Sequence, residues 1–408
     1  MNILIMSNLY PPIVSGSSTQ ASMLAKELIN HGHTVIVITT KSGDDQKSYE
    51  LENNIHIYRI PSINLPKMAI TFNFPWIQWT LTPGNLNLIE SIIKKHKPDI
   101  IHLHNHMFDL AISAVIMKHK FKIPLVITIH TIVQHPNKFY NIILQLIDKS
   151  ILKYCVIDQA DWIINPDKTC SQYIQQTFDK KNSVIILYGI EEAIVTDTSI
   201  SKTIIDTYHL EGKQIFLSLG HVHELRNRKD IIDAMPEILK TFPDFILLIV
   251  GDIGTKKPQL LAQKLGVENS VIFTGSVPHS VVPSLFEISD MVGQWFHISN
   301  PQNKTLGIAT LEAMSAGKII IGTADEDVYG DGILINKKNV ILIPPQHPEI
   351  LAKYVIEILQ HKYDHIGTNA SKTIKQYFLW PAVCDQTIHL YERALSEKYT
   401  SFRMSSDH

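Results

Sequence analysis

Two successive series of short apolar runs, each alternating with helical segments, constrain the fold of this chain more than any other feature. The first series opens with residues 2–6 (NILIM), and the second opens with residues 215–219 (IFLSL). Runs of this length fit strands that are buried on both faces of a parallel sheet. Between them, residues 21–28 have helical apolar spacing and residues 34–38 form the next run, which completes a β-α-β unit. The pattern predicts two Rossmann-like, doubly wound α/β domains.

The domain boundaries follow from a polar stretch that interrupts this rhythm. We expect a first domain over 1–195, a second over 196–375, a closing helix over 376–396 and a frayed tail over 397–408. Open α/β sheets bind ligands at the carboxyl ends of their strands, so a cleft between the two domains is the expected site.

Charge and cysteine usage exclude several classes of protein. The chain has 39 acidic and 37 basic residues, without the basic excess of a nucleic-acid-binding protein. Its three cysteines, Cys155, Cys170 and Cys384, form no CxxC pair or disulfide framework, which suits a reducing compartment. The N-terminus does not resemble a signal peptide, and no apolar run approaches the roughly 18 residues of a spanning helix. We therefore expect a cytoplasmic protein and leave open a contact with the inner face of the membrane.

A carboxylate in an apolar segment is the first candidate for a site. Glu312 lies within LGIATLEAMSAG (306–317), which predicts a helix from near Thr305 to near Gly317. A charge among such residues usually has a partner or a ligand, because its desolvation is costly. Free N–H groups at the helix start, from Thr305 through Leu306 to Gly307, suit a phosphate or sugar oxygen. The alternative is an exposed glutamate without a ligand.

Two turns rich in glycine or basic residues follow predicted strands. Residues 220–229 begin with Gly220 and carry Arg226, Arg228 and Lys229 just before a helix. These cations are suited to a diphosphate, although a solvated basic turn is the alternative. Gly16, in the turn after the first strand, would let a ligand approach the backbone.

Histidines and aromatic residues are weaker candidates for a functional site. His102, His104 and His106 alternate, but they lack the aspartate of the HxHxDH metallohydrolase signature, so we expect no metal. His130 ends a predicted strand, where it is well placed for chemistry. The aromatic stretch 68–79, which includes Trp76, is either a contact for an acceptor or membrane surface, or a helix packed on the sheet.

Taken in order, these segments resemble the retaining glycosyltransferases of family 4, which have the GT-B fold. The resemblance covers nearly the whole chain. It rests on YPP with Gly16, on PDIIH (98–102), TIH (128–130), YGIE (188–191) and residues 220–234, on LEAM (311–314) with Gly317, and on FLW (378–380) with Tyr391.

This resemblance implies a transfer of sugar from a nucleotide sugar to a glycan, glycolipid or small-molecule acceptor, as in polysaccharide biosynthesis. The first domain would hold the acceptor and the second the donor, without a metal or other cofactor. By position in the motifs, the implied catalytic residues are His130, Arg226 and Glu312. The implied donor-binding residues are Gly16, Gly220, His221, Arg226, Lys229, Lys304, Thr305, Leu306, Gly307 and Glu312, and the implied acceptor-side residues are His104 and Trp76.

Four positions depart from the family pattern. Lys304 replaces the first glutamate of the E-x7-E motif, His221 replaces an arginine, Arg226 replaces a lysine and Tyr188 replaces an asparagine. Lys304 and His221 also keep two rival functions open: a catalytically silent protein of this fold that binds a nucleotide or a partner, and a sugar-nucleotide 2-epimerase.

Overall fold

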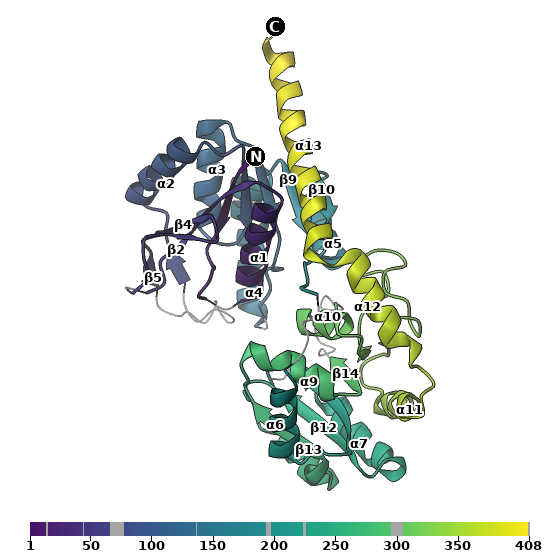
Figure 1. Cartoon of the computed structure of the whole chain (residues 1–408). Helices are drawn as coiled ribbons and strands as arrows, with labels where there is room; N and C mark the ends of the chain where they lie inside the picture. The colour runs from purple at the N-terminus through teal and green to yellow at the C-terminus, as the bar shows by residue number, and fades with distance from the viewer. Residues whose placement is uncertain are drawn as a thin grey trace. The chain divides into compact units, whose positions relative to one another are not determined.

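The computed structural model describes residues 1–13, 15–43, 45–65, 77–135, 137–192, 197–222, 226–294 and 305–406. The chain divides into two compact units (Figure 1). Unit 1 contains Met1–Gly189 and Trp380–His408, and unit 2 contains Ile190–Leu379. Trp76 and Lys304 lie outside the described residues.

Unit 1 is built on an eight-stranded sheet in the order β10-β9-β8-β7-β1-β2-β4-β3. Neighbouring strands are parallel except β3 and β4. The strands are β1 (Asn2–Ser7), β2 (Thr34–Thr40), β3 (Tyr49–Glu52), β4 (Ile55–Ile60), β7 (Ile100–His104), β8 (Leu125–Thr128), β9 (Trp162–Asn165) and β10 (Ser183–Ile185). β7, β8 and β9 are buried throughout, as expected of strands that are covered on both faces.

Several helices of unit 1 begin at side-chain caps. The side chains of Ser15, Thr82 and Asp167 each accept a hydrogen bond from a backbone N–H of the first turn that follows. The helical segments are α1 (Gly16–Asn30), α2 (Pro83–His96), α3 (Leu110–Phe121), α4 (Lys138–Ile147), the π-helical η2 (Asp148–Ile157), α5 (Lys168–Phe178) and α13 (Trp380–Ser406).

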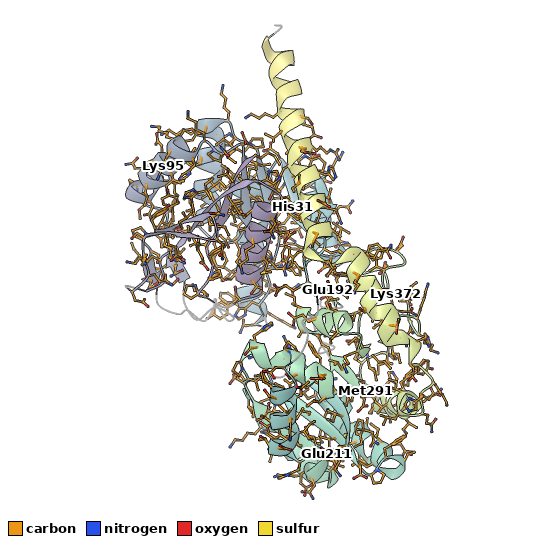
Figure 2. The ribbon with its side chains drawn as sticks, viewed as in Figure 1. His31, Lys95, Glu192, Glu211, Met291 and Lys372 are labelled. Atoms are coloured by element: carbon orange, nitrogen blue, oxygen red, sulfur yellow. The ribbon has the colours of Figure 1, made fainter. Side chains whose placement is uncertain are left out.

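Helix α13 is joined to unit 1 although it lies at the other end of the sequence. The Tyr391 hydroxyl and His102 Nδ1 are 2.6 Å apart, and Trp162 Nε1 donates to Glu397 over 3.0 Å. Figure 2 labels His31 at the end of α1, where its Nε2 lies 3.2 Å from Asp385 of α13. These contacts explain why the closing helix belongs to the first unit.

Unit 2 is built on a six-stranded, fully parallel sheet in the order β13-β12-β11-β14-β15-β16. Its strands are β11 (Gln214–Leu219), β12 (Phe245–Val250), β13 (Val271–Gly275), β14 (Met291–Gln294), β15 (Ile319–Gly322) and β16 (Ile341–Leu342). Its helical segments are α6 (Thr198–Tyr208), α7 (Lys229–Thr241), α8 (Lys257–Leu265), η3 (Glu268–Ser270), η4 (His279–Val281), α9 (Val282–Ile288), α10 (Ile308–Ser315), α11 (Pro348–Leu359) and α12 (His365–Tyr377).

The structure confirms two doubly wound α/β units, and it differs from the sequence analysis at their borders. The chain passes between units at Gly189/Ile190 and Leu379/Trp380, not at 195/196 and 375/376. The reason is packing: a Cβ on Gly189 would lie 2.2 Å from the Trp380 ring, and Ile190 pairs with Leu379. Helix α13 also extends to Ser406, into the stretch 397–408 expected to be frayed.

The aromatic stretch is only partly described. Ile77–Trp79 form strand β6, which pairs with β5 (Ile63–Leu65), so the alternative of a helix is wrong for these three residues. No helix within the described ranges is long and apolar enough to cross a membrane.

Candidate functional site

The strand order of each unit marks one place where a ligand is expected. In unit 2, β11 lies between β12 and β14, so the loops that leave β11 and β14 diverge at this point. In unit 1, β1 lies between β2 and β7 in the same way, with Ser7 opposite His104. Ligands of open α/β sheets bind at such switch points, outside the carboxyl ends of the strands. The predicted site residues that the structure describes fall at or next to these points.

The turn after β11 is shaped by two glycines. Gly220 has φ +109°, and a Cβ there would lie 1.6 Å from Nη1 of Arg226. Gly251, with φ +147°, would bring a Cβ to 2.3 Å from the Gly220 carbonyl oxygen. The positive φ disfavours a side chain at both positions, and at Gly251 the backbone contact excludes a Cβ as well, so both glycines let the turn pack closely beneath Arg226. His221, the next residue of the turn, is exposed.

Two guanidinium groups converge on this turn. Nη1 of Arg226 donates to the Leu219 carbonyl over 3.3 Å, and Nη2 of Arg228 donates to the carbonyls of Leu219 (3.3 Å) and Gly220 (3.0 Å). Arg228 is only 2% exposed, and its buried Nε has no hydrogen-bond partner. Burial lowers the pKa of Arg226, and burial together with the charge of Arg226 lowers the pKa of Arg228 to about 10.

The charge of these two arginines is not neutralised within the described part of the chain, where neither has a carboxylate partner. A buried cation is costly unless an anion accompanies it. Lys229 differs, because it is 70% exposed and forms an ion pair with Asp233 on α7. The turn therefore presents Arg226 and Arg228 as a site for an anion. Arg228 was one of the three cations considered for a diphosphate from the sequence, but it was not among the donor-binding residues that the family resemblance implied.

Glu312 lies on α10, partly buried, as its apolar sequence surroundings predicted. Its Oε1 is 3.5 Å from Nε2 of His279, at the start of η4. Burial raises the pKa of Glu312, His279 offsets part of the rise, and Glu191 adds to it. The side chain remains 26% exposed, so its second oxygen can accept a hydrogen bond from a ligand.

The start of α10 corrects one expectation. The helix begins at Ile308 rather than near Thr305, and the Gly307 N–H is not free because it donates to Oε1 of Gln294 over 2.8 Å. The Thr310 hydroxyl donates to the same oxygen. Gln294, at the end of β14, thus caps the helix through tertiary contact, which no local pattern could reveal.

The two residues before Gly307 differ in their burial. Leu306 is buried, and its carbonyl accepts from the Tyr329 hydroxyl over 2.6 Å, so its side chain is a core residue. Thr305 is partly buried. Because the first N–H groups of a helix have no intrahelical acceptor, the amides of Ile308 and Ala309 replace that of Gly307 as candidates for a phosphate or sugar oxygen.

Unit 1 places His130 in a chain of buried and partly buried polar side chains. Its Nε2 is 2.9 Å from Nδ1 of His104, and its Nδ1 is 3.0 Å from the Tyr188 hydroxyl. Burial lowers the pKa of His130 to about 3 and that of His104 well below its usual value. Both imidazoles are therefore neutral near pH 7. They can orient a hydroxyl group but do not supply a positive charge.

The polar atoms around His104 are not all satisfied by the described residues. Nε2 of His104, both side-chain polar atoms of Asn8 and Oδ1 of Asn105 are buried without a hydrogen-bond partner. Buried polar atoms normally have partners, so these are available to a ligand or to water. A cavity of about 30 Å³ is lined by His104, together with His102, His130 and Tyr188 among others, whereas Asn8 and Asn105 do not line it. Asn8 and Asn105 were missed from the sequence because a lone asparagine after a strand carries no motif.

The remaining predictions in unit 1 concern Gly16 and the alternating histidines. Gly16 is the first residue of α1, and a Cβ there would meet no atom within 4 Å. His102 contacts Tyr391 and Thr128, whereas Nε2 of His106 lies 3.4 Å from Asp148. The HxHxH run therefore does not converge on one point. Within the described ranges, no group of three histidine, cysteine or acidic residues is arranged to hold a metal ion.

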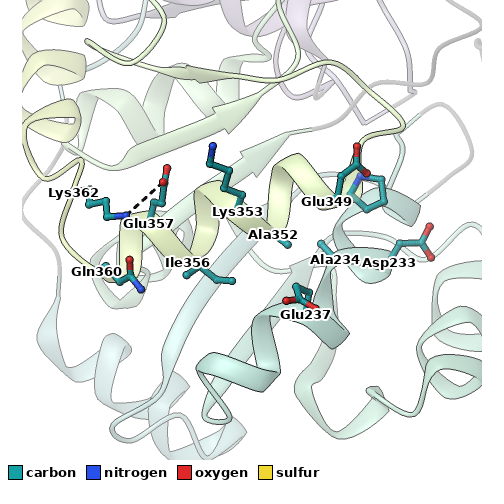
Figure 3. A pocket seen from close by; sticks show the side chains of 11 residues that line it. Asp233, Ala234, Glu237, Glu349, Ala352, Lys353, Ile356, Glu357, Gln360 and Lys362 are labelled. Carbon is teal, nitrogen blue, oxygen red and sulfur yellow. Dashed lines mark hydrogen bonds and ion pairs between the residues drawn. The ribbon is translucent and has the colours of Figure 1, made fainter.

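A cavity of about 690 Å³ lies elsewhere, between α7 and α11 (Figure 3). None of the predicted site residues lines it. Its carboxylates are already paired with basic side chains: Asp233 with Lys229, Glu237 with Lys240, Glu349 with His347 and Glu357 with Lys362. We therefore assign it no ligand.

Comparison with known proteins supports the same division of the chain. The family model "Glycosyltransferase Family 4" matches residues 14–193, and "Glycosyl transferases group 1" matches residues 201–373. The alpha-monoglucosyldiacylglycerol synthase of Streptococcus pneumoniae is 26% identical over 403 residues, which cover 93% of this chain and 86% of that protein.

Two solved structures have the same fold at low sequence identity. Sucrose-phosphate synthase from Thermosynechococcus elongatus has a TM-score of 0.73 and 16% identity, over 97% of this chain and 100% of that one. HepE from Anabaena in complex with UDP-glucose has a TM-score of 0.67 and 16% identity, over 98% and 100%.

Proposed function

Since this chain belongs to the group 1 glycosyltransferases of family 4, which have the GT-B fold, we propose that it transfers a hexose from a nucleotide sugar to a lipid-linked acceptor, with retention of the anomeric configuration. The single observation that carries the proposal is the pair of cations Arg226 and Arg228 at the switch point of unit 2, for which the described residues provide no carboxylate partner. A nucleoside diphosphate would supply an anionic partner for these two cations, and guanidinium groups bind phosphate oxygens in a defined geometry.

The names of the similar proteins indicate which donor and acceptor should be tested first. The pneumococcal relative is named for glucosyl transfer to diacylglycerol, and HepE was solved with UDP-glucose. We therefore take UDP-glucose as the first donor to test and diacylglycerol, or a glycolipid built on it, as the first acceptor. In this assignment Glu312 accepts hydrogen bonds from the ribose hydroxyls, and the amides of Ile308 and Ala309 approach the phosphates.

The chemical step needs stabilisation of the leaving group. As the bond between sugar and diphosphate breaks, negative charge grows on the diphosphate, and in this proposal Arg226 stabilises that charge. His130, neutral because of its burial, would orient a sugar hydroxyl near the reacting carbon, and the unpaired atoms of Asn8, His104 and Asn105 would receive hydroxyl groups of the acceptor. As the acceptor oxygen bonds to the sugar carbon and the bond to the diphosphate breaks, the proton of the acceptor hydroxyl passes to the departing diphosphate. In this scheme the protein groups bind or orient, and no histidine needs to take up that proton.

Donor binding by the purified protein tests the proposal. Thermal shift should be measured with UDP, UDP-glucose, GDP-mannose and UMP. A ligand present at 100 times its dissociation constant stabilises a protein by about 2.7 kcal/mol, which is easily detected. We expect the uridine diphosphates to stabilise the protein and UMP, which lacks the second phosphate, to do so much less. Absence of stabilisation by every nucleotide would contradict the proposal.

We predict that transfer does not require a divalent metal. The diphosphate charge is met by Arg226, Arg228 and helix-start amides, so a metal bridge between phosphates is unnecessary. Initial rates in excess chelator should lie within twofold of those in magnesium. Complete loss in chelator that is restored by magnesium or manganese would refute this prediction.

Lys304 gives a prediction about the donor sugar, although it lies outside the described residues. We expect a neutral donor, because backbone groups can take over hydroxyl recognition more easily than a new ion pair can form. UDP-glucose should therefore exceed UDP-glucuronate in kcat/KM, and Lys304→Glu should change both donors similarly. A selective loss of the acidic donor in Lys304→Glu, by tenfold (about 1.4 kcal/mol) or more, would show instead that Lys304 pairs with a sugar carboxylate.

A further inference from the structure

An apolar surface on α4 and η2 is not used by the site described above. Phe139, Ile142 and Leu146 of α4 are 66%, 60% and 63% exposed, and Ile151 and Tyr154 of η2 are 54% and 63% exposed. Positions 139, 142 and 146 have the i, i+3, i+7 spacing of a single helix face, and η2 continues directly from α4. None of the ten residues of α4 is buried. We call these five side chains the apolar face.

The opposite side of the segment is fixed to unit 1, so the apolar face cannot turn inward. Asp148 is fully buried, accepts a hydrogen bond from Tyr173 and lies 3.4 Å from His106. Gln145 Nε2 donates to the Val133 carbonyl over 2.9 Å. Contiguous apolar patches of this kind on a soluble unit mark sites of interaction.

The charges around the apolar face indicate what covers it. Lys138 and Lys149 are exposed near the two ends of α4. Asp148 is the sole acidic residue between positions 138 and 157, and it points into the unit. Large apolar side chains flanked by lysines, without exposed carboxylates, match a bilayer surface that contains anionic lipid.

The place of the segment in the chain connects this surface to the acceptor. Only residues 131–137 separate His130, at the carboxyl edge of the unit 1 sheet, from the start of α4. We propose that the apolar face docks unit 1 on an anionic membrane surface, where a lipid-linked acceptor is delivered to the edge that carries His130 and His104. The inference rests on the proposed function, because a water-soluble acceptor would need no such surface.

Co-sedimentation with vesicles tests the inference. The parent protein should sediment with vesicles of phosphatidylcholine and phosphatidylglycerol, and less with phosphatidylcholine alone. Leu146→Glu and the double variant Phe139→Glu/Leu146→Glu should lower the partition coefficient at least tenfold. Leu260→Glu is the matched control, because Leu260 is 61% exposed on α8 of unit 2; it should sediment like the parent. Lys138→Gln/Lys149→Gln should lose the preference for anionic vesicles.

The readouts separate this inference from the proposed function. The vesicles contain no diacylglycerol, so sedimentation does not depend on transfer, and stabilisation by UDP should be equal in parent and Leu146→Glu. Parent-like sedimentation of Leu146→Glu, or an equal loss in Leu260→Glu, would overturn the docking surface and leave the transfer reaction untouched. Light scattering gives a further check. A parent dimer that Leu146→Glu dissociates, with sedimentation unchanged, would also overturn the inference, since a second copy would then cover the face.

Discussion

Replacing Glu312 with glutamine should weaken binding of the nucleotide-sugar donor by about 10- to 150-fold. The amide keeps the size of the side chain but loses the charged acceptor for ribose hydroxyls, and hydrogen bonds to charged groups contribute roughly 1.5–3 kcal/mol. Titration calorimetry with UDP-glucose measures the effect. Glu357→Gln is a suitable control: its side chain is 19% exposed, against 26% for Glu312, and it pairs with Lys362 at the cavity between α7 and α11, to which no ligand is assigned.

The melting temperature and the pH dependence of donor binding distinguish a donor-binding role of Glu312 from a structural role. Burial raises the folded-state pKa of Glu312, so the ionised carboxylate disfavours folding at neutral pH, and Glu312→Gln should not lower the melting temperature. Donor binding by the parent should fall as the pH decreases through the raised pKa. His279 holds this pKa down, so His279→Ala should move the fall to higher pH. Parent-like affinity in Glu312→Gln would show that the assignment is wrong.

The second large effect is expected at Arg226. Arg226→Ala should lower kcat by about 100- to 1,000-fold with a smaller change in donor affinity, because removal of a well-aimed group that stabilises developing charge costs about 3–4 kcal/mol. The structural reason is that the guanidinium is held over Gly220, at the edge where the diphosphate would lie. Single-turnover kinetics separate the chemical step from donor binding.

Lys240→Ala supplies the charge-matched control for this variant. Lys240 is 71% exposed in the last turn of α7, so its loss should change kcat less than twofold. A loss of affinity in Arg226→Ala that is equal to the loss of kcat/KM, with kcat unchanged, would indicate uniform binding of donor and transition state. No loss at all would move the role to Arg228.

The fold was accessible from the sequence because its determinants are local. Runs such as Phe245–Val250 are buried over their full length, and the alternation of such runs with helical spacing forces parallel sheets. Borders between units were less accessible, since they depend on distant partners. Gly189 ends unit 1 because the Trp380 ring packs against it, about 190 residues later in the chain.

Features of the candidate site could be predicted where a single residue stands out in its local sequence. They could not be predicted where they depend on contacts between distant segments. Glu312 was singled out because its helix is apolar, and the structure finds it partly buried; Gly220 was singled out after a strand, and the structure gives it φ +109°. The cap that Gln294 provides for Gly307 joins two segments and has no signature in either one. The burial of Arg228, which separates it from the solvated Lys229 beside it, likewise depends on packing.

The product of the reaction gives the most direct test of the central claim. The protein should be incubated with UDP-glucose and vesicles that contain diacylglycerol, and the lipid product analysed by NMR at the anomeric position while released UDP is quantified. The account predicts an α-linked glucosyl lipid, with the configuration of the donor retained and one UDP released for each sugar transferred. A β-linked product would contradict retention. Failure to transfer sugar from any nucleotide sugar to any lipid acceptor, by protein that is folded, would contradict the proposed function itself.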